Sequence, residues 1–240
     1  MDRAALITGG SSGIGLAIAR ALGEDGYRLT ISARRPDKLE AAAQELRDAG
    51  FDAEPVPANM ADEEEIKKLV AAHRERCGRL DVVINNAGIG IGGAVADADT
   101  KKLDLQLDVN LRAVYLLARE TIPLLKEAGA EHGKALMANT ASIAGKHGQG
   151  WLAAYSATKF GVVGLSQALH KELSKDGIQV TAICPGFVAT AMTDWVEGQV
   201  PKDEMIQPED IAEAIRFLLR TSRNCVVPEI QFVRPGDSEI

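Results

Sequence analysis

Two side chains near the middle of the sequence have the types and the spacing needed for proton transfer. Tyr155 and Lys159 are four residues apart in a stretch with helical spacing of apolar residues, so both should project from one face of a helix. A nearby ammonium group stabilises a phenolate, and we expect Lys159 to lower the pKa of Tyr155. A shift from ~10 to near neutrality requires about 4 kcal/mol of preferential stabilisation of the anion. The pair therefore predicts a general acid or base.

A glycine-rich turn near the start of the sequence has the composition of a phosphate-binding loop. The segment TGGSSGIG (8–15) lies between a predicted strand and a predicted helix. Glycines allow the backbone to bend tightly and to approach a pyrophosphate at the amino end of that helix. The spacing is G-x-x-x-G-x-G, whereas the commonest dinucleotide fingerprint is G-x-G-x-x-G. The candidate cofactor-binding residues in this turn are Gly9, Ser11, Ser12, Gly13, Ile14 and Gly15.

The residues after the second predicted strand indicate which dinucleotide would bind. An acidic residue at this place holds the ribose diol of NAD(H), but here the sequence reads Ser32-Ala33-Arg34-Arg35. Arg34 could bind a 2′-phosphate through paired hydrogen bonds, with Arg35 as a second candidate. The alternative is that both arginines form a solvated helix entrance. We expect NADP(H), with NAD(H) as the less favoured cofactor.

Short apolar runs alternate with longer amphipathic stretches along nearly the whole chain. Between the runs, apolar residues recur at helical spacing, and the longest such stretches cover 103–129 and 153 to about 175. The predicted strands are 4–8, 28–32, 53–57, 80–85, 134–139, 179–184 and 229–233. The glycines expected to end helices are Gly26, Gly50, Gly78, Gly129 and Gly177.

This alternation predicts an α/β fold. We expect a doubly wound, Rossmann-type parallel sheet of about seven strands with helices on both faces. No linker or internal repeat interrupts the pattern, so residues 1–240 are expected to form a single domain. The binding crevice should lie at the carboxyl ends of the strands.

Composition excludes several classes of function. The net charge of −7 disfavours a broad surface for nucleic acid or an anionic membrane. No segment has the length needed to span a bilayer, and the apolar run 4–7 is too short for the core of a signal peptide, so we expect a cytoplasmic protein. Cys77, Cys184 and Cys225 are widely separated, and the histidines lack metal-ligand spacing, so neither a disulfide nor a metal site is expected.

The motifs together resemble those of the short-chain dehydrogenase/reductases in their compact form. The resemblance extends over nearly the whole chain, and the order and separation of the motifs make it specific. The matching residues are TGGSSGIG (8–15), NNAG (85–88), Asn110, Ser142, YSATK (155–159) and PGFVAT (185–190).

The resemblance implies hydride transfer between a nicotinamide and a carbonyl or secondary-alcohol carbon, with Tyr155 as the acid/base. Lys159 would also hold the nicotinamide ribose, and Ser142 would hydrogen-bond the substrate oxygen. Asn110 would hold a water that links the lysine to solvent. The alternative for Tyr155 and Lys159 is a surface aromatic beside a solvated lysine.

The resemblance also implies further contacts with the cofactor. Where the family often has an aspartate beside the adenine, this sequence has Asn59. Its carbonyl oxygen can still accept a hydrogen bond from the adenine amino group. The implied contacts are Asn59, Asn86, Ala87, Gly88, Tyr155, Lys159, Pro185, Gly186, Val188 and Thr190.

For substrate binding we expect Trp151 to join Ser142 and Tyr155. The segment 191–206 is short, which favours a small or medium-sized, fairly polar substrate. The resemblance implies a homodimer or homotetramer that pairs the helices around 104–128 and 153–175.

Two other functions share part of this pattern. A regulatory protein could bind NADP(H) without turnover, although it would not need Ser142, Tyr155 and Lys159 together. A sugar-nucleotide epimerase or dehydratase can use a tyrosine–lysine pair, but it usually needs a larger substrate-binding portion, and the chain has no room for one after about 220.

Overall fold

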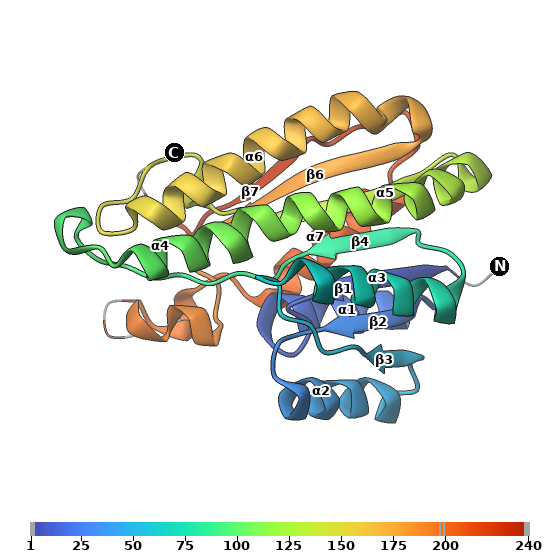
Figure 1. Ribbon diagram of the computed structural model, residues 1–240, viewed down its shortest axis with the longest axis horizontal. Helices are drawn as coiled ribbons and strands as arrows, with labels where there is room; N and C mark the ends of the chain where they lie inside the picture. Colours follow the sequence, from blue (N-terminus) through green and yellow to red (C-terminus); the bar gives the residue numbers. More distant parts are fainter. Residues whose placement is uncertain (1–2, 197, 199, 238–240) are drawn as a thin grey trace.

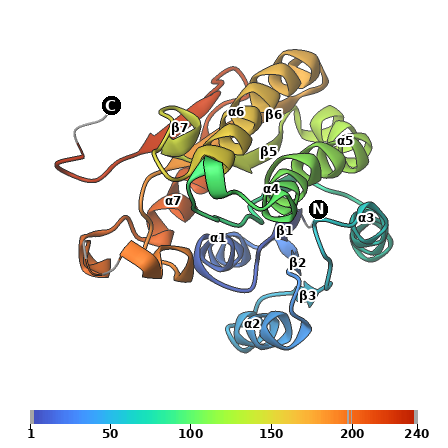
Figure 2. The ribbon, with the colours of Figure 1, turned by 60° about the vertical axis from the view of Figure 1, so that its left-hand side comes forward.

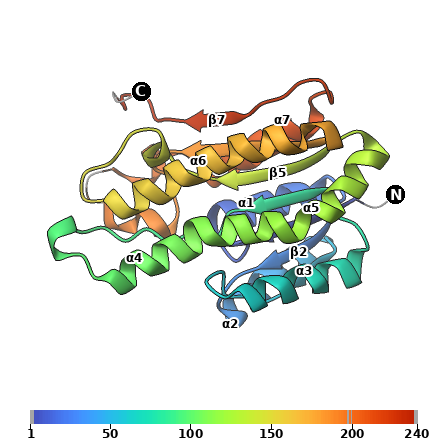
Figure 3. The ribbon, with the colours of Figure 1, turned by 45° about the horizontal axis from the view of Figure 1, so that its top comes forward.

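One parallel sheet determines where a ligand can bind. The computed structural model describes residues 3–196, 198 and 200–237. Seven strands pair in the order β3-β2-β1-β4-β5-β6-β7, and every pair is parallel (Figures 1 and 3). The strands are β1 (Ala4–Thr8), β2 (Arg28–Ser32), β3 (Ala53–Pro55), β4 (Val82–Asn85), β5 (Ala135–Thr140), β6 (Ile178–Pro185) and β7 (Glu229–Phe232).

The strand order reverses between β1 and β4. From β1 the chain moves outward to β2 and β3, and from β4 it moves outward in the other direction to β7. Neighbouring loops therefore diverge at the carboxyl ends of β1 and β4 and leave a crevice there. The expected doubly wound α/β fold with seven strands is confirmed.

Helices cover both faces of the sheet (Figure 2). On one face, Ile18, Leu39 and Ile215 pack into a core cluster that also contains buried residues of β1, β2 and β4. On the other face, Leu69, Leu117 and further residues form a second cluster. The helices are α1 (Gly13–Glu24), α2 (Pro36–Asp48), α3 (Glu63–Cys77), α4 (Thr100–Leu107), α5 (Ala113–His132), α6 (Ala153–Leu173) and α7 (Pro208–Arg220).

The third strand is shorter than expected. It pairs with β2 only from Ala53 to Pro55, although the apolar run predicted a strand to Pro57. The amides of Val56 and Ala58 still donate to the carbonyls of Ile31 and Ala33 at 2.9 and 3.2 Å, so the chain follows β2 a little beyond the paired residues.

The predicted long helix is interrupted. A short π-helical segment, η2 (Asp108–Arg112), separates α4 from α5. The helix then continues beyond Gly129 and ends before Gly133, which adopts the left-handed backbone (φ 71°) of a helix-terminating glycine. Gly129 serves another purpose, because a β-carbon there would lie 2.4 Å from the Asp176 carbonyl oxygen. The other four expected glycine stops do adopt positive φ.

The irregular segments gather at one end of the molecule. Figures 1 and 3 show α4, the loop before α6 and the segment after β6 together at the end where the strands terminate. That last segment contains η5 (Ala191–Val196) and η6 (Lys202–Glu204), with 197 and 199 outside the described residues. Within the described part of the chain, no helix combines the length and apolarity needed to cross a membrane.

Candidate active site

A cleft of about 280 Å³ opens at the carboxyl ends of the central strands. It brings together most of the residues predicted to bind a cofactor or to act in catalysis. Those lining the cleft are Gly9, Ser11, Ser12, Gly13, Ile14, Asn86, Ala87, Gly88, Ser142, Tyr155, Lys159, Pro185, Gly186, Val188 and Thr190. The predicted residues that do not line it are Gly15, Arg34, Arg35, Asn59, Asn110 and Trp151.

At three of its glycines, the turn is packed too closely to carry a side chain. A β-carbon on Gly9 would lie 2.8 Å from the Asn86 amide nitrogen, and one on Gly13 would lie 2.8 Å from Thr190 Cγ2. Gly15 lies behind the cleft, where a β-carbon would come within 2.3 Å of the Gly9 carbonyl oxygen. The turn therefore brings bare backbone to the cleft, which is what a bound pyrophosphate requires.

In the part of the chain that the structure describes, no side chain caps the amino end of α1. Ser12 precedes the helix, but its side chain makes no capping hydrogen bond, and the first turn has no acidic residue. In α3, by contrast, the Asp62 carboxylate accepts hydrogen bonds from the amides of Glu64 and Glu65. The start of α1 is thus open to an anion from the cleft, and this fits a nucleotide phosphate.

Beyond the end of β2 the chain offers positive charge. Arg34 and Arg35 are exposed and make no ion pair or hydrogen bond with other described side chains, and Arg35 occupies the position before α2. The Ser32 hydroxyl is buried without a hydrogen-bond partner among the described residues. Asn59 Oδ1 accepts a hydrogen bond from the Ala61 amide at 3.2 Å, so part of its capacity is used in its own turn.

A chain of hydrogen bonds crosses the ends of three strands and joins the two parts of the site. Lys159 Nζ donates to the carbonyl oxygen of Thr140, the last residue of β5, at 2.7 Å. The Thr140 hydroxyl donates to Asn86 Oδ1 at 3.3 Å, and Asn86 Nδ2 donates to the Thr8 carbonyl at 3.1 Å. The Thr8 hydroxyl accepts from the amides of Asn86 and Ala87 at 3.0 and 3.1 Å.

The Tyr155 ring lies close to the Lys159 ammonium, whose Nζ is 5.5 Å from the ring centroid. Burial raises the pKa of Tyr155 above its ordinary value, and the Ser142 hydroxyl acts in the opposite direction. The expected net lowering by Lys159 is therefore wrong for this structure, because burial of the phenol outweighs the stabilisation of its anion. The phenol stays protonated at neutral pH, which is the form that can donate a proton.

Ser142 is held against α6, the helix that carries Tyr155 and Lys159. Its hydroxyl accepts from the Ala144 amide at 3.1 Å and donates to the Pro185 carbonyl at 3.3 Å. The short helix η3 (Ile143–Gly145) follows it. A β-carbon on Gly145 would lie 2.6 Å from the Lys159 carbonyl oxygen, so η3 packs directly on α6.

The Lys159 ammonium is buried, with 4% of the residue exposed. Burial lowers its pKa to about 8, because the charged form is the one that loses solvation. The neighbouring Cys184 thiol is also buried, and its pKa is raised to about 12, so it stays a protonated packing residue.

Asn110 clamps the loop after β4. It lies in η2 and is buried; its Oδ1 accepts from the Ile89 amide and its Nδ2 donates to the Ile89 carbonyl, both at 2.8 Å. Gln106, one turn earlier, accepts from the Ile91 amide at 3.1 Å. The π-helical turn thus coincides with the residue that fixes the loop, as such turns often do at functional sites.

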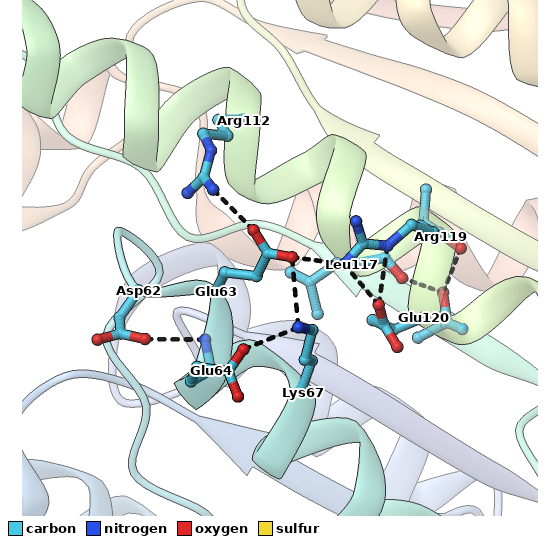
Figure 4. A network of polar contacts seen from close by, with 10 residues as sticks. Asp62, Glu63, Glu64, Lys67, Arg112, Leu117, Arg119 and Glu120 are labelled. Carbon is cyan, nitrogen blue, oxygen red and sulfur yellow. Dashed lines mark hydrogen bonds and ion pairs between the residues drawn. The ribbon is translucent and has the colours of Figure 1, made fainter.

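An ion-pair network ties η2 to α3 (Figure 4). Arg112 and Arg119 approach Glu63 from one side, with Nη2–Oε distances of 2.8 and 2.9 Å. Lys67 Nζ approaches the same carboxylate at 3.4 Å. All four side chains are partly exposed, so each pair alone stabilises little, but together they restrain the segment that carries Asn110.

Several residues of the site were not predicted from the sequence. Thr8 and Thr140 connect strand ends, and Gln106 assists Asn110. Thr8 stands directly before the glycine turn, and this position could have indicated it. Gln106 and Thr140 carry no local signal, because their roles depend on which loops the sheet brings together.

A second cavity of about 680 Å³ lies at the opposite ends of the strands, beside Lys126, His170 and Arg223. None of the predicted site residues lines it. Within the described residues, no group of three or more His, Cys, Asp or Glu side chains is arranged to hold a metal ion.

Known proteins match this chain over most of their length. Residues 3–200 match the short chain dehydrogenase family. A Streptomyces coelicolor protein named "Putative ketoacyl reductase" is 41% identical over 236 residues, which are 90% of this chain and 89% of the relative. The crystal structure of a variant actinorhodin polyketide ketoreductase with NADPH is 35% identical, with a TM-score of 0.87 over 96% of this chain and 95% of its own.

A 3-ketoacyl-(acyl-carrier-protein) reductase from Brucella melitensis, solved with NADH, is 32% identical, with a TM-score of 0.87 over 98% of this chain and 97% of its own. The protein belongs to the short-chain dehydrogenase family. Membership and the solved neighbours support an NAD(P)-dependent dehydrogenase or reductase that acts on a small molecule.

The lowered pKa of Lys159 predicts a pH-dependent stability. Below pH ~8 Lys159 is charged in the native and in the unfolded state, and the burial of its charge destabilises the native state. Between pH ~8 and ~10.5 the native state loses this proton while the unfolded state keeps it, so the stability of the protein with Lys159 rises with pH. The free energy of unfolding of Lys159→Met, minus that of the parent, should fall by about 2 kcal/mol between pH ~7 and ~10.

Urea unfolding of the two proteins at each pH measures this difference. Lys171→Met, on the exposed face of the same helix, is the control and should differ from the parent by a constant amount. A constant difference for Lys159→Met as well would contradict the lowered pKa.

Proposed function

We propose that the protein is an NADP(H)-dependent oxidoreductase that reduces a ketone or aldehyde, with Tyr155 as the acid/base, and that residues 1–240 act as one catalytic domain. The main support is the cleft that holds Ser142, Tyr155 and Lys159 together with the open start of α1. The hydrogen-bond chain from Lys159 to Thr8 links these two parts.

The residues around the cleft suit the dinucleotide as follows. The open amides of α1 would hold the pyrophosphate, and Arg34 would bind the 2′-phosphate, with Arg35 beside it. Lys159 would hold the nicotinamide ribose, and Asn59 would accept from the adenine. Asn86, Ala87 and Gly88 would border the adenosine ribose, and the nicotinamide would lie against Pro185, Gly186, Val188 and Thr190. When bound, the nicotinamide supplies the hydride or accepts it in the reverse direction.

The protein's own residues manage the proton. Tyr155 donates its phenolic proton to the substrate oxygen, which becomes the hydroxyl of the alcohol, and takes the proton back in the reverse direction. The Ser142 hydroxyl would turn from the Pro185 carbonyl to donate its hydrogen bond to the same oxygen and stabilise its developing charge. As the phenolate forms, the nearby Lys159 ammonium stabilises it.

Asn110 is proposed to help return a proton to Tyr155 through water beside the lysine. The place that a β-carbon on Gly88 would take is 3.4 Å from Asn110 Oδ1 and 3.6 Å from Lys159 Nζ. This common neighbour supports a polar connection between the amide and the ammonium.

We further propose a cytoplasmic homodimer or homotetramer, as the family resemblance implies. Tyr115 on α5 and Phe160 on α6 expose 57% and 46% of their surface, and both helices belong to the predicted contact. Light scattering at micromolar concentration should give a multiple of the chain mass; a monomer would contradict this part of the proposal.

Replacement of Tyr155 by phenylalanine should separate binding from turnover. Removing the proton donor should lower kcat/KM for carbonyl reduction by about 10²- to 10⁴-fold. The dissociation constant for NADPH should change little, because the ring remains. Oxidation of NADPH with a panel of ketones and aldehydes measures the first quantity, and fluorescence titration measures the second.

Tyr115→Phe removes a hydroxyl from an exposed side chain that does not line the cleft, and it serves as the control, with parental rates expected. Near-parental turnover in Tyr155→Phe would show that another group donates the proton. Tight NADPH binding without turnover of any carbonyl in the parent would instead favour a regulatory protein.

The cofactor preference should depend on Arg34. The parent should bind NADPH more tightly than NADH, and Arg34→Ala should weaken NADPH binding about 10- to 100-fold through loss of charge-assisted hydrogen bonds. Binding of NADH should stay within about threefold, because it lacks the 2′-phosphate. Arg35→Ala should have the smaller effect. Equal dissociation constants for the two cofactors in the parent would overturn the preference.

A further inference from the structure

Three aromatic side chains form a cluster, here called the aromatic mouth: Trp151, Phe187 and Trp195. The ring centroids of Trp151 and Trp195 are 5.9 Å apart with an interplanar angle of 48°, and Phe187 meets Trp195 edge-on at 6.3 Å. Trp151 and Trp195 nevertheless expose 60% and 55% of their surface. The two indoles are held together and still leave large apolar area uncovered.

The aromatic mouth lies at the edge of the catalytic cleft. Phe187 stands between Gly186 and Val188, which line the cleft, and Trp195 lies in η5 with the cleft residues Met192 and Thr193. Trp151 belongs to the loop between Ser142 and Tyr155. The three rings therefore approach from segments that also form the cleft wall.

The glycine-rich loop after β4 joins Trp151 to the reaction centre. The place of a β-carbon on Gly90 is 3.9 Å from the Tyr155 ring, and one on Gly92 would be 2.2 Å from the Trp151 ring. The Gly93 amide donates to the Trp151 carbonyl at 2.8 Å. Any side chain at 92 would displace the Trp151 indole, so the indole can take this position only because residue 92 is a glycine.

Trp151 is held in an unfavourable backbone conformation. Its φ of 67° is the only positive φ of a non-glycine residue in the described part of the chain. A bulky residue rarely adopts this conformation unless the surroundings impose it. This conformation leaves the Trp151 indole exposed at the edge of the cleft, so the indole buries little area that could offset the strain.

Phe187 packs between Trp195 and Arg234. The Arg234 guanidinium lies 5.7 Å from the centroid of the Phe187 ring, and Arg234 is fixed by an ion pair with Asp237 at 2.7 Å. With Arg234 against it and Trp195 at its edge, Phe187 is less available to a ligand. The exposed surface that remains is that of Trp151 and Trp195.

We propose that Trp151 and Trp195 bind a flat aromatic ring of the substrate next to the reacting carbonyl, so that the protein prefers ketones with an aromatic ring. This inference rests on the proposed function. It differs from the small or medium-sized, fairly polar substrate that the short segment 191–206 led us to expect. Aromatic rings gain from stacked or edge-on contacts beyond the area they bury, so a flat ring is favoured over a puckered one of similar size.

Three ketones with the same methyl carbonyl group test this: 4-phenylbutan-2-one, 4-cyclohexylbutan-2-one and butan-2-one. The two ring compounds are also compared with homologues whose ring is set one or three carbons from the carbonyl. At the best spacing the parent should reduce the phenyl ketone with a kcat/KM about tenfold above that for the cyclohexyl ketone. Trp151→Ala and Trp195→Ala should remove most of this ratio, mainly through KM. Their kcat/KM for butan-2-one, which has no ring, should fall by a smaller factor than that for the phenyl ketone.

Trp151→Phe should retain most of the preference, and Phe217→Ala, which removes an exposed ring from α7, is the control and should retain all of it. Quenching of tryptophan fluorescence by 4-phenylbutan-2-ol gives a readout that needs no turnover. The quenching should saturate in the parent. In each alanine variant the one remaining tryptophan should need a higher concentration of the alcohol for half-maximal quenching.

The outcomes separate this inference from the proposed function. Reduction of all three ketones without preference for the phenyl compound would overturn the aromatic site and leave the oxidoreductase intact. Equal losses for all ketones in the alanine variants, with a lower mass in light scattering, would make the aromatic mouth a contact between copies and also overturn it. Saturable, tryptophan-dependent quenching without turnover would support the aromatic site and contradict the proposed function.

Discussion

The hydrogen bond from the Lys159 ammonium to the Thr140 carbonyl is the interaction on which the site depends. A buried cation needs an acceptor, and the last carbonyl of β5 provides one at 2.7 Å. The bond fixes α6 against the sheet, and through the Thr140 hydroxyl and Asn86 its effect reaches the end of β1. The proposed proton donor on α6 and the proposed phosphate site beside α1 are therefore parts of one framework.

The reversal of strand order explains why this framework surrounds a cleft. Loops after β1 and β4 turn away from each other, so the strand ends between them are not covered by a crossing connection. Side chains from distant parts of the sequence, such as Thr8, Asn86 and Lys159, meet there. The sheet supplies the placement, and a small number of polar side chains supply the chemistry.

Much of this could be predicted from the sequence because the signals are local. Alternating apolar runs predicted the strands and their parallel sheet, and the glycine turn and the Tyr155–Lys159 spacing predicted the main parts of the cleft. The π-helical turn at Asn110 could not be predicted, since one extra residue in a turn hardly changes an apolar pattern. Gly129 was wrongly predicted to end a helix, because the sequence does not distinguish a glycine needed for close packing from one that ends a helix. The direction of the Tyr155 pKa shift depends on burial, which spacing does not give.

The uncapped start of α1 has a consequence for the folded state itself. A helix whose first amides lack partners frays more readily than one with a capping side chain such as Asp62 of α3. An anion seated there would protect the turn from local opening. Hydrogen exchange or limited proteolysis around residues 11–16 would thus report whether the proposed nucleotide occupies the cleft, without any chemical turnover.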